Sequence, residues 1–515
     1  MLQISHLTLT HRKDLRTILS DFTFVLNAGD KAVIIGEEGN GKSTLLKWIY
    51  DPELIADYID AEGTRTDQGE KLAYLPQELP ASEQDLSVYE YFLKHETFEV
   101  CDASELRVMA AKLGLPADFY YSEQRMGTLS GGERIKVQMA ALLLARPDIL
   151  LLDEPSNDID LETLSWMEEM ILSFPGAVLF ISPDETLIER TANRVILLEQ
   201  LRRKTLPRAT IANVPFLQFR KERADAFAKQ AQLAGSERRE EKKAMERFQR
   251  IEQIVEHQQN TISRGDPHGG YLLKRRMAKV IALERRYERE HAQMTEYPEE
   301  ETAITIRFDR QIAMPAGKTV IEFQEPVLTA PDGKTVLARD IFLQVRGPKK
   351  VCIIGRNGVG KTTFLRQIVE TLHEKDNLKV CYMPQNYEDL LAMNETPIDY
   401  LAPSGDKDEI TMVRTYLGAM KYTADEMLHP IAELSGGQKA KILLLKMSLS
   451  EADVLVLDEP TRNFSPLSGP QIRGILKDFS GAILSISHDR KYIEEVCDTI
   501  YELTPNGLIS RASVQ

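Results

Sequence analysis

The sequence predicts an α/β fold made of two copies of one unit, joined by a long helical hairpin. A short apolar strand, a glycine-bearing loop and a helix occur near residue 40 and again near residue 360. In each copy a later apolar strand ends in an Asp-Glu pair. Between the copies, charged residues alternate with apolar ones at three- and four-residue steps, which is typical of amphipathic helices. We therefore divide the chain into residues 1–207, 208–300 and 301–515.

The composition predicts a folded protein of several domains without a membrane segment. The chain has 515 residues, 43% of them hydrophobic, which is enough for more than one core. The four cysteines lack CxxC spacing, so we expect neither a disulfide framework nor a zinc or iron–sulfur site, and a reducing cytoplasm as the location. The N-terminus reads as a strand and not as a signal peptide. The most apolar stretch is interrupted at Arg146, Pro147 and Asp148, short of the roughly 20 residues that cross a bilayer.

The charge is distributed unevenly along the chain. Residues 216–290 contain 18 Lys and Arg against 12 Asp and Glu, a net charge of +6. Because the whole chain carries −15, the rest carries −21. A basic segment on an acidic body indicates a polyanionic partner.

The first glycine-bearing loop matches the G-x-x-x-x-G-K-[ST] pattern, in which backbone N–H groups and a helix N-terminus bind nucleotide phosphates. Lys42 is expected to reach the β- and γ-phosphates, and Ser43 to hold Mg²⁺ through its hydroxyl. The ATP-binding residues predicted for this loop are Gly36, Gly39, Gly41, Lys42, Ser43 and Thr44.

Three further motifs follow in the first copy. Gln77 ends an apolar strand, and an LSGGE run supplies Ser130, Gly131 and Gly132 as ATP-binding candidates. An apolar strand then delivers two carboxylates at its C-terminal end, where ligands bind in open α/β sheets. The first acid, Asp153, suits Mg²⁺, and the second, Glu154, suits activation of the attacking water.

The second copy repeats these motifs in register. The Ser of the LSGG run precedes the Asp of the Asp-Glu pair by 23 residues in both copies. This repetition indicates an internal duplication. In the second copy, Thr362 and Asp458 are the expected Mg²⁺ ligands, and Glu459 is the expected catalytic base. The ATP-binding candidates are Gly355, Gly358, Gly360, Lys361, Thr362, Thr363, Gln385, Ser435, Gly436 and Gly437.

In this order the motifs resemble those of ATP-binding cassette ATPases. The resemblance implies that each LSGG signature caps the γ-phosphate of ATP bound by the opposite cassette, so the two cassettes pair head to tail within the chain. It also implies a catalytic His after the next strand, which is His488 in the second copy but Pro183 in the first. Proline has no side-chain donor, so we expect the second site to hydrolyse ATP faster. Whether His11 stacks on adenine or is a surface histidine stays open, and no stacking residue is assigned in the second copy.

The basic segment is predicted to form two antiparallel helices that pack together. The apolar residues expected at their contact are Met245, Phe248, Ile251, Val255, Leu273, Met277, Val280 and Tyr287. The connection between the helices is expected at Gly265, Pro267, Gly269 and Gly270. The cations beside it either stay solvated or contact RNA phosphates. These RNA-contact candidates are Arg264, Lys274, Arg275 and Arg276.

Two cassettes with a basic helical hairpin between them resemble the ABC-F proteins over nearly the whole chain. The resemblance implies an ATPase that binds the ribosomal exit site in its ATP-closed state and is released on hydrolysis. Its hairpin would then reach toward P-site tRNA, 23S rRNA and the peptidyl-transferase centre. The sequence does not separate a housekeeping translation factor from an antibiotic-resistance protein. The alternative is an ATPase subunit that energises a membrane transporter.

Overall fold

The computed structural model describes residues 1–157, 159–261, 267–292, 294–298, 306, 308, 314–331, 333–373 and 378–511. The chain forms two compact units. One consists of Met1–Phe216 together with Glu301–Gln515, and the other of Leu217–Glu300. The first unit contains both cassettes and the second contains the hairpin.

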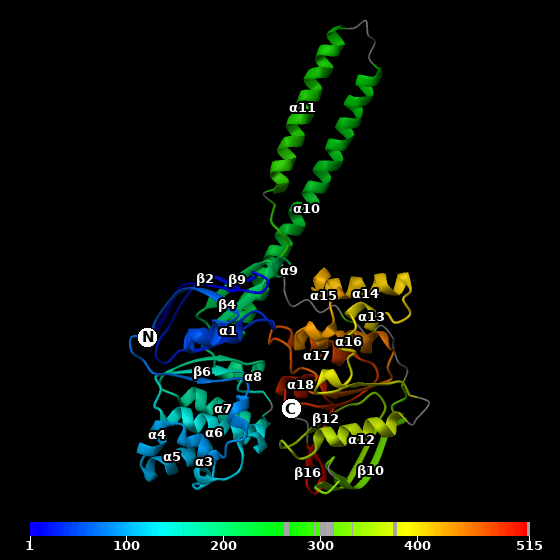
Figure 1. Ribbon diagram of the computed structural model, residues 1–515. Helices are drawn as coiled ribbons and strands as arrows, with labels where there is room; N and C mark the ends of the chain where they lie inside the picture. The colour runs from blue at the N-terminus through cyan, green and yellow to red at the C-terminus, as the bar shows by residue number, and fades with distance from the viewer. Residues whose placement is uncertain are drawn as a thin grey trace. The chain divides into compact units, whose positions relative to one another are not determined.

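The first cassette is built on a six-stranded sheet in the order β5-β6-β7-β3-β8-β9 (Figure 1). Its strands are β3 (Lys31–Ile35), β5 (Leu72–Leu75), β6 (Ile149–Asp153), β7 (Ala177–Ile181), β8 (Arg194–Gln200) and β9 (Leu206–Ala212). All pairs are parallel except β8 with β9. Every residue of β3, β6 and β7 is buried, which explains why all of them except the terminal Lys31 and Asp153 are apolar. Because β9 belongs to this sheet, the cassette extends past the predicted boundary at residue 207.

Smaller elements complete the first cassette. A three-stranded antiparallel sheet has the order β2-β1-β4, formed by β1 (Leu2–His11), β2 (Thr17–Leu26) and β4 (Ile59–Thr66). The helices are α1 (Lys42–Tyr50), α2 (Ala81–Gln84), α3 (Val88–Leu93), α4 (Glu96–Val100), α5 (Ala103–Leu113), α6 (Gly131–Leu144), α7 (Leu161–Ser173), α8 (Glu185–Thr191) and α9 (Leu201–Lys204). Helix α1 follows β3 directly, so the phosphate-binding loop lies between a buried strand and a helix N-terminus.

The second cassette repeats the topology, with the strand order β13-β14-β15-β12-β16-β17 and an antiparallel β10-β11 pair. Its strands are β10 (Thr319–Thr329), β11 (Val336–Arg346), β12 (Lys350–Ile354), β13 (Val380–Met383), β14 (Val454–Asp458), β15 (Ala482–Ile486), β16 (Thr499–Thr504) and β17 (Gly507–Arg511). Its helices are α12 (Lys361–His373), α13 (Pro397–Leu401), α14 (Lys407–Ala419), α15 (Ala424–Leu428), α16 (Gly436–Leu449), α17 (Gly469–Asp478) and α18 (Arg490–Val496). The duplication in sequence is therefore a duplication of fold.

The hairpin unit consists of two long helices, α10 (Phe216–Thr261) and α11 (Pro267–Ala292) (Figure 1). The predicted interruptions at Pro267, Gly269 and Gly270 are wrong, because these residues lie in the first turn of α11. Proline is compatible with a helix start, since the first N–H groups of a helix have no intrahelical partner. The predicted break at Gly265 lies outside the described residues.

The two hairpin helices pack through a narrow apolar seam. Phe248, Val255 and Val280 are its buried residues. The rings of Phe248 and Tyr287 meet edge to face, with centroids 6.0 Å apart. The prediction that Met245 and Ile251 lie at the contact between the helices is wrong, because these side chains are 40% and 45% exposed. A straight two-helix contact covers a narrower stripe than the apolar pattern suggested. The predicted contact Met277 packs against the seam, and the side chain of Leu273 is outside the described residues.

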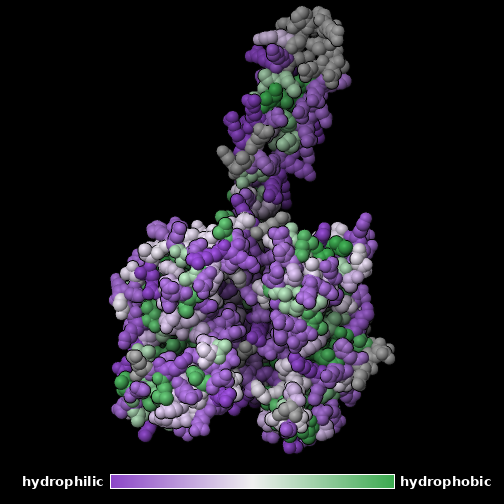
Figure 2. All heavy atoms as spheres, viewed as in Figure 1, coloured by the Kyte–Doolittle hydropathy of each residue, from purple (hydrophilic) through white to green (hydrophobic). Residues whose placement is uncertain are grey.

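Figure 2 shows mainly hydrophilic side chains along the hairpin, with hydrophobic ones between them. Within the part of the chain that the structure describes, no helix is both long and apolar enough to cross a membrane.

Candidate nucleotide sites

Both phosphate-binding loops require glycine for steric reasons. Gly41, which precedes α1, has φ +84°, and a Cβ atom there would lie 2.3 Å from the side chain of Ile18. Gly36 has φ +152°, and a Cβ atom would lie 2.3 Å from the carbonyl oxygen of Leu198. The predicted glycines thus let the backbone turn tightly, as a phosphate-binding loop requires.

The loop lysines lie where the pattern predicts. Lys42 Nζ donates hydrogen bonds to the carbonyl oxygens of Gly36 and Glu37, at 3.0 and 2.9 Å. Lys361 Nζ makes the corresponding bonds in the second loop. Burial lowers the pKa of Lys361, against the opposing charges of Glu459, Asp160 and Asp458. Each ammonium group is therefore held against the backbone of its own loop by hydrogen bonds to two carbonyl oxygens.

The first acid of each Asp-Glu pair suits a magnesium ion. Asp153 and Asp458 are each 1% exposed, and burial raises both pKa values. Ser43 donates a hydrogen bond to Asp153 at 2.8 Å, and Thr362 lies beside Asp458. Asp458 Oδ2 is buried and has no hydrogen-bond partner among the described residues. A paired hydroxyl and carboxylate are hard oxygen ligands of the kind Mg²⁺ prefers, so these residues fit the ion.

The second acid of each pair sits on a strained backbone. Glu154 and Glu459 have φ values of +51° and +53°, a conformation uncommon for non-glycine residues. Burial raises the pKa of Glu459 to about 8, and the charge of Asp458 adds to the effect. His488 donates its backbone N–H to Glu459 at 3.2 Å, and its Nε2 lies 3.8 Å from Glu459 Oε1. Burial also lowers the pKa of His488 to about 3, so this ring is neutral beside the base.

The first copy surrounds its glutamate differently. Gln77 and Asn157 donate side-chain hydrogen bonds to Glu154 Oε2, at 2.9 and 2.6 Å. Burial raises the pKa of Glu154, while Lys42 opposes the effect. Pro183 lines the same cavity in place of a histidine. The carboxylate is therefore held by two amides and has no imidazole neighbour at that position.

Each signature begins a helix through a capping box. Ser130 caps α6 with Glu133 as the reciprocal partner, and Ser435 caps α16 with Gln438. The boxes hold the glycines that follow in the first turn of each helix, where backbone N–H groups have no intrahelical partner. The predicted signature glycines are therefore placed to meet an anion.

A large cavity lies at the second phosphate-binding loop. Its volume is about 1260 Å³. Its lining combines Lys361, Gln385 and His488 with Ser130 and Gly131 of the opposite cassette. Ala330, Pro331 and Leu337 also line it, and they provide the apolar surface for a base that the sequence left unassigned.

The first phosphate-binding loop also faces the second cassette, where Glu38 of the loop accepts a hydrogen bond from the N–H of the signature residue Gly437. The cavity there has about 210 Å³ and is lined by Lys42, Ser43 and Gln77 together with Asn463 and Ser465 of the second cassette. The two cassettes therefore meet head to tail. His11 instead packs near Tyr58, with ring centroids 6.5 Å apart.

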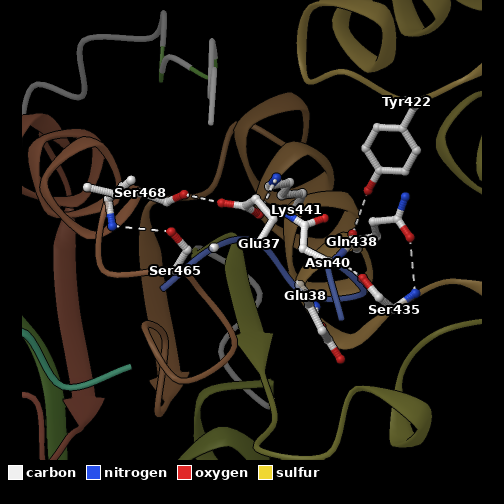
Figure 3. Close-up of polar contacts among 12 residues, drawn as sticks. Glu37, Glu38, Asn40, Tyr422, Ser435, Gln438, Lys441, Ser465 and Ser468 are labelled. Atoms are coloured by element: carbon white, nitrogen blue, oxygen red, sulfur yellow. Dashed lines mark hydrogen bonds and ion pairs between the residues drawn. The ribbon is translucent and has the colours of Figure 1, made fainter. Parts of the chain in front are cut away.

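Acidic residues join the first loop to the second signature (Figure 3). Glu38 accepts a hydrogen bond from the N–H of Gly437. Glu37 forms an ion pair with Lys441 at 3.2 Å and accepts a hydrogen bond from Ser468 at 2.7 Å. The sequence analysis missed both acids. Comparing the two copies would have found them, because Arg356 and Asn357 stand at these positions in the second loop.

The sequence analysis also missed two neighbours of the predicted acids. Tyr74 donates a hydrogen bond to Asp153 at 3.1 Å, and Asn157 bonds Glu154 as described above. Tyr74 is at the third position of a strand, and no motif marks it. Only the parallel pairing of β5 with β6 brings it to the acid.

The RNA-contact candidates lie on the hairpin. Lys274, Arg275 and Arg276 are exposed near the start of α11. Arg276 also donates a hydrogen bond to Gln258 on α10, at 3.0 Å. Tyr271, one turn earlier, is 65% exposed. Arg264 lies outside the described residues.

Comparisons with known proteins identify the family. The family model described as ABC transporter matches residues 19–157 and 338–462, just over half of the chain. Ribosome protection protein VmlR of Bacillus subtilis is 27% identical, covering 96% of this chain and 85% of that protein. Protein GCN20 of Saccharomyces cerevisiae is 24% identical, and the match covers 97% of this chain and 69% of that protein. Among solved structures, an archaeal ribosome recycling factor, aABCE1, matches with a TM-score of 0.59 and 15% identity, over 98% of this chain and 90% of the other.

Proposed function

Because this chain belongs to the ATP-binding cassette family, as an ABC-F protein that hydrolyses ATP, we propose that it is a ribosome-associated translation factor. It binds the ribosome when ATP holds its cassettes together, and hydrolysis releases it. The observation that carries this proposal is the exposed group of Lys274, Arg275 and Arg276 on a hairpin that lies between the two cassettes in the sequence.

The hairpin has the chemistry of an RNA-binding surface. Its cations suit phosphates, where Arg and Lys supply salt-dependent and largely sequence-independent affinity. Exposed Tyr271 and Leu272, beside these cations, offer a face for unstacked bases. We propose that this surface contacts 23S rRNA and P-site tRNA near the peptidyl-transferase centre, with the cassettes at the exit site.

One relative supports this assignment, because VmlR is a ribosome protection protein. A solved structure of similar fold is that of an archaeal ribosome recycling factor. We extend the proposal to the protection of cytoplasmic ribosomes from an antibiotic. The test below can instead show a housekeeping role in translation.

The geometry of the second site supports the following mechanism of hydrolysis. Lys361 and the loop N–H groups bind the β- and γ-phosphates, and Ser130 and Gly131 of the first cassette close over the γ-phosphate. Glu459 takes a proton from the attacking water as the new O–P bond forms and the bond to the β-phosphate oxygen breaks. His488, neutral and adjacent, orients the γ-phosphate. Mg²⁺, held by Thr362 and Asp458, would neutralise charge on the phosphates.

Co-sedimentation with 70S ribosomes tests the proposal. The Glu154→Gln, Glu459→Gln double variant should retain ATP but hydrolyse it slowly, which traps the closed state. We expect it to pellet with ribosomes in ATP but not in ADP, and less as salt increases. A Lys42→Ala, Lys361→Ala variant is the matched control, because it should bind no ATP and should stay in the supernatant.

Absence of pelleting in either nucleotide would overturn the ribosomal role. Recovery of the trapped variant with membrane proteins would then favour an ATPase subunit of a transporter. If pelleting occurs, peptide synthesis in the presence of antibiotics separates protection from a housekeeping role.

A further inference from the structure

The first phosphate-binding loop carries two negative charges of its own. It reads Gly36-Glu37-Glu38-Gly39, whereas the second loop has Arg356 and Asn357 at the same positions. Phosphate-binding loops attract anions through their N–H groups and helix dipole. Two carboxylates there oppose that attraction, so they need a structural explanation.

The carboxylate of Glu38 occupies the N-terminus of the opposite signature helix. It accepts the N–H of Gly437, which lies in the first turn of α16. A Cβ atom on Gly436 would come within 3.2 Å of Glu38 Oε2, so the acid also lies directly against the preceding glycine. Glu38 and Glu154 line the same cavity, which places the charge of Glu38 near the hydrolytic carboxylate. An anion between signature and catalytic glutamate is where a γ-phosphate would be expected.

Glu37 fastens the same loop to the second cassette. Its side chain is 12% exposed, and its partner Lys441 is 6% exposed. Ser468 adds a hydrogen bond to the other carboxylate oxygen (Figure 3). Burial alone would raise the pKa of Glu37, but Lys441, Ser468 and Lys42 lower it below the usual value, so the acid is charged. Because Glu37 is fully engaged in this way, only Glu38 faces the signature glycines.

The second loop has no carboxylate at the positions of Glu37 and Glu38. Arg356 pairs with Glu162 at 3.3 Å, but both side chains are more than two-thirds exposed, so this contact is weak. The cavity at that loop has about 1260 Å³, against about 210 Å³ at the first. Ligand pockets for small molecules usually have about 300 to 1000 Å³. The cavity at the second loop is therefore large enough for a complete triphosphate, whereas the cavity described at the first loop is smaller than this range.

We propose that Glu38 determines the nucleotide specificity of the first site: its carboxylate takes the γ-phosphate position at the second signature, so that site selects a nucleoside diphosphate over a triphosphate. The inference rests on the proposed nucleotide-binding role of the first loop. A bound diphosphate keeps its β-phosphate on Lys42, while Glu38 completes the contact with Gly437. The cassettes then stay joined at the first site through turnover, and ATP hydrolysis opens only the second.

Calorimetry on the full chain tests this specificity. A Lys361→Ala background leaves the first site as the one competent to bind, and Mg·ADP and the non-hydrolysable Mg·AMP-PNP are the probes. We expect ADP to bind at least about tenfold more tightly than AMP-PNP, because the γ-phosphate meets a like charge. Glu38→Asn, which installs the residue of the second loop, should bring the ratio below about threefold. Equal affinities with Glu38 present, an unchanged ratio in Glu38→Asn, or no binding of either probe would overturn the proposal.

Two matched variants test whether the preference for diphosphate depends on where the negative charge lies in the loop or only on its presence there. Glu37→Gln should leave the ratio unchanged, because that carboxylate faces Lys441 and Ser468. A shift as large as that of Glu38→Asn would overturn the assignment to Glu38. Asn357→Glu in a Lys42→Ala background should impose the diphosphate preference on the second site, and failure to do so counts against the mechanism. These assays contain no ribosomes. Their result therefore does not depend on whether the protein binds ribosomes, and the two proposals can fail separately.

Discussion

Arg473 of the second cassette and Glu185 of the first form a two-pronged ion pair in which both side chains are 3% exposed. Arg473 Nη1 lies 2.5 Å from Glu185 Oε1, and Nη2 lies 3.2 Å from Oε2. Arg490 extends this contact by pairing with Glu168 and Asp184 of the first cassette. Basic residues of one cassette therefore meet acidic residues of the other at the interface that also carries the nucleotide sites.

Arg473→Ala should destabilise the cassette unit by about 3 to 5 kcal/mol, because the buried carboxylate of Glu185 would lose the guanidinium group that pairs with it. Urea denaturation followed by tryptophan fluorescence measures the change in midpoint. Arg511→Ala is the control, because its pair with Glu502 is exposed on the arginine side and should contribute about 1 kcal/mol or less. Equal shifts of the urea midpoint in the two variants would contradict the expectation that the buried ion pair contributes more to stability than the exposed one.

The two catalytic glutamates should differ in their effect on turnover. Glu459→Gln should lower kcat about 100-fold or more, the usual range for loss of a general base. Glu154→Gln should lower it by less than about threefold, because Pro183 and Glu38 leave the first site poorly suited to hydrolysis. Steady-state phosphate release compares the two. Similar losses would contradict the asymmetry.

ATP hydrolysis should depend on pH through Glu459. Only the deprotonated carboxylate accepts a proton, and burial raises its pKa to about 8. Hence kcat/KM should fall about tenfold per pH unit as pH decreases below that value, and level off above it. His488 stays neutral throughout, because its pKa is about 3. The profile of Glu459→Gln should be flat, and a retained slope would assign the titration to another group.

The cations of α11 should govern the salt dependence of ribosome binding. Replacing Lys274, Arg275 and Arg276 by Ala should reduce the slope of log affinity against log salt by roughly 2 to 3, if each contacts a phosphate. Filter binding or sedimentation over a salt series measures it. Lys242→Ala with Lys243→Ala removes exposed cations elsewhere on the hairpin and should change the slope less. The same loss in both variants would indicate a diffuse charge effect.

The apolar seam should control hairpin stability. Phe248→Ala should cost about 3 kcal/mol or more, because the ring is buried against Tyr287. Native-state hydrogen exchange of α10 amides reports the local opening energy. Ile251→Ala, three residues away and 45% exposed, should change it by less than about 0.5 kcal/mol. Comparable effects would mean that both side chains face the seam.

The sequence by itself determined the two cassettes, the helical hairpin and the residues of the phosphate loops, signatures and Asp-Glu pairs. These features follow from local spacing: a strand, a glycine loop and a helix place Lys42 and Ser43 wherever the unit folds. The sequence also identified His488 and showed that Pro183 stands at the equivalent position of the first copy, since the two copies can be compared position by position.

Tertiary structure alone decided which side chains of the two copies contact each other. Glu38 and Gly437 are 399 residues apart in sequence, and Arg473 and Glu185 are 288 apart. Such pairs arise only when two folded surfaces pack together, and an isolated acid or arginine gives no sign of its partner. The same reason explains Ile251, whose apolar side chain fits a helical stripe but lies beyond the width that one neighbouring helix can cover.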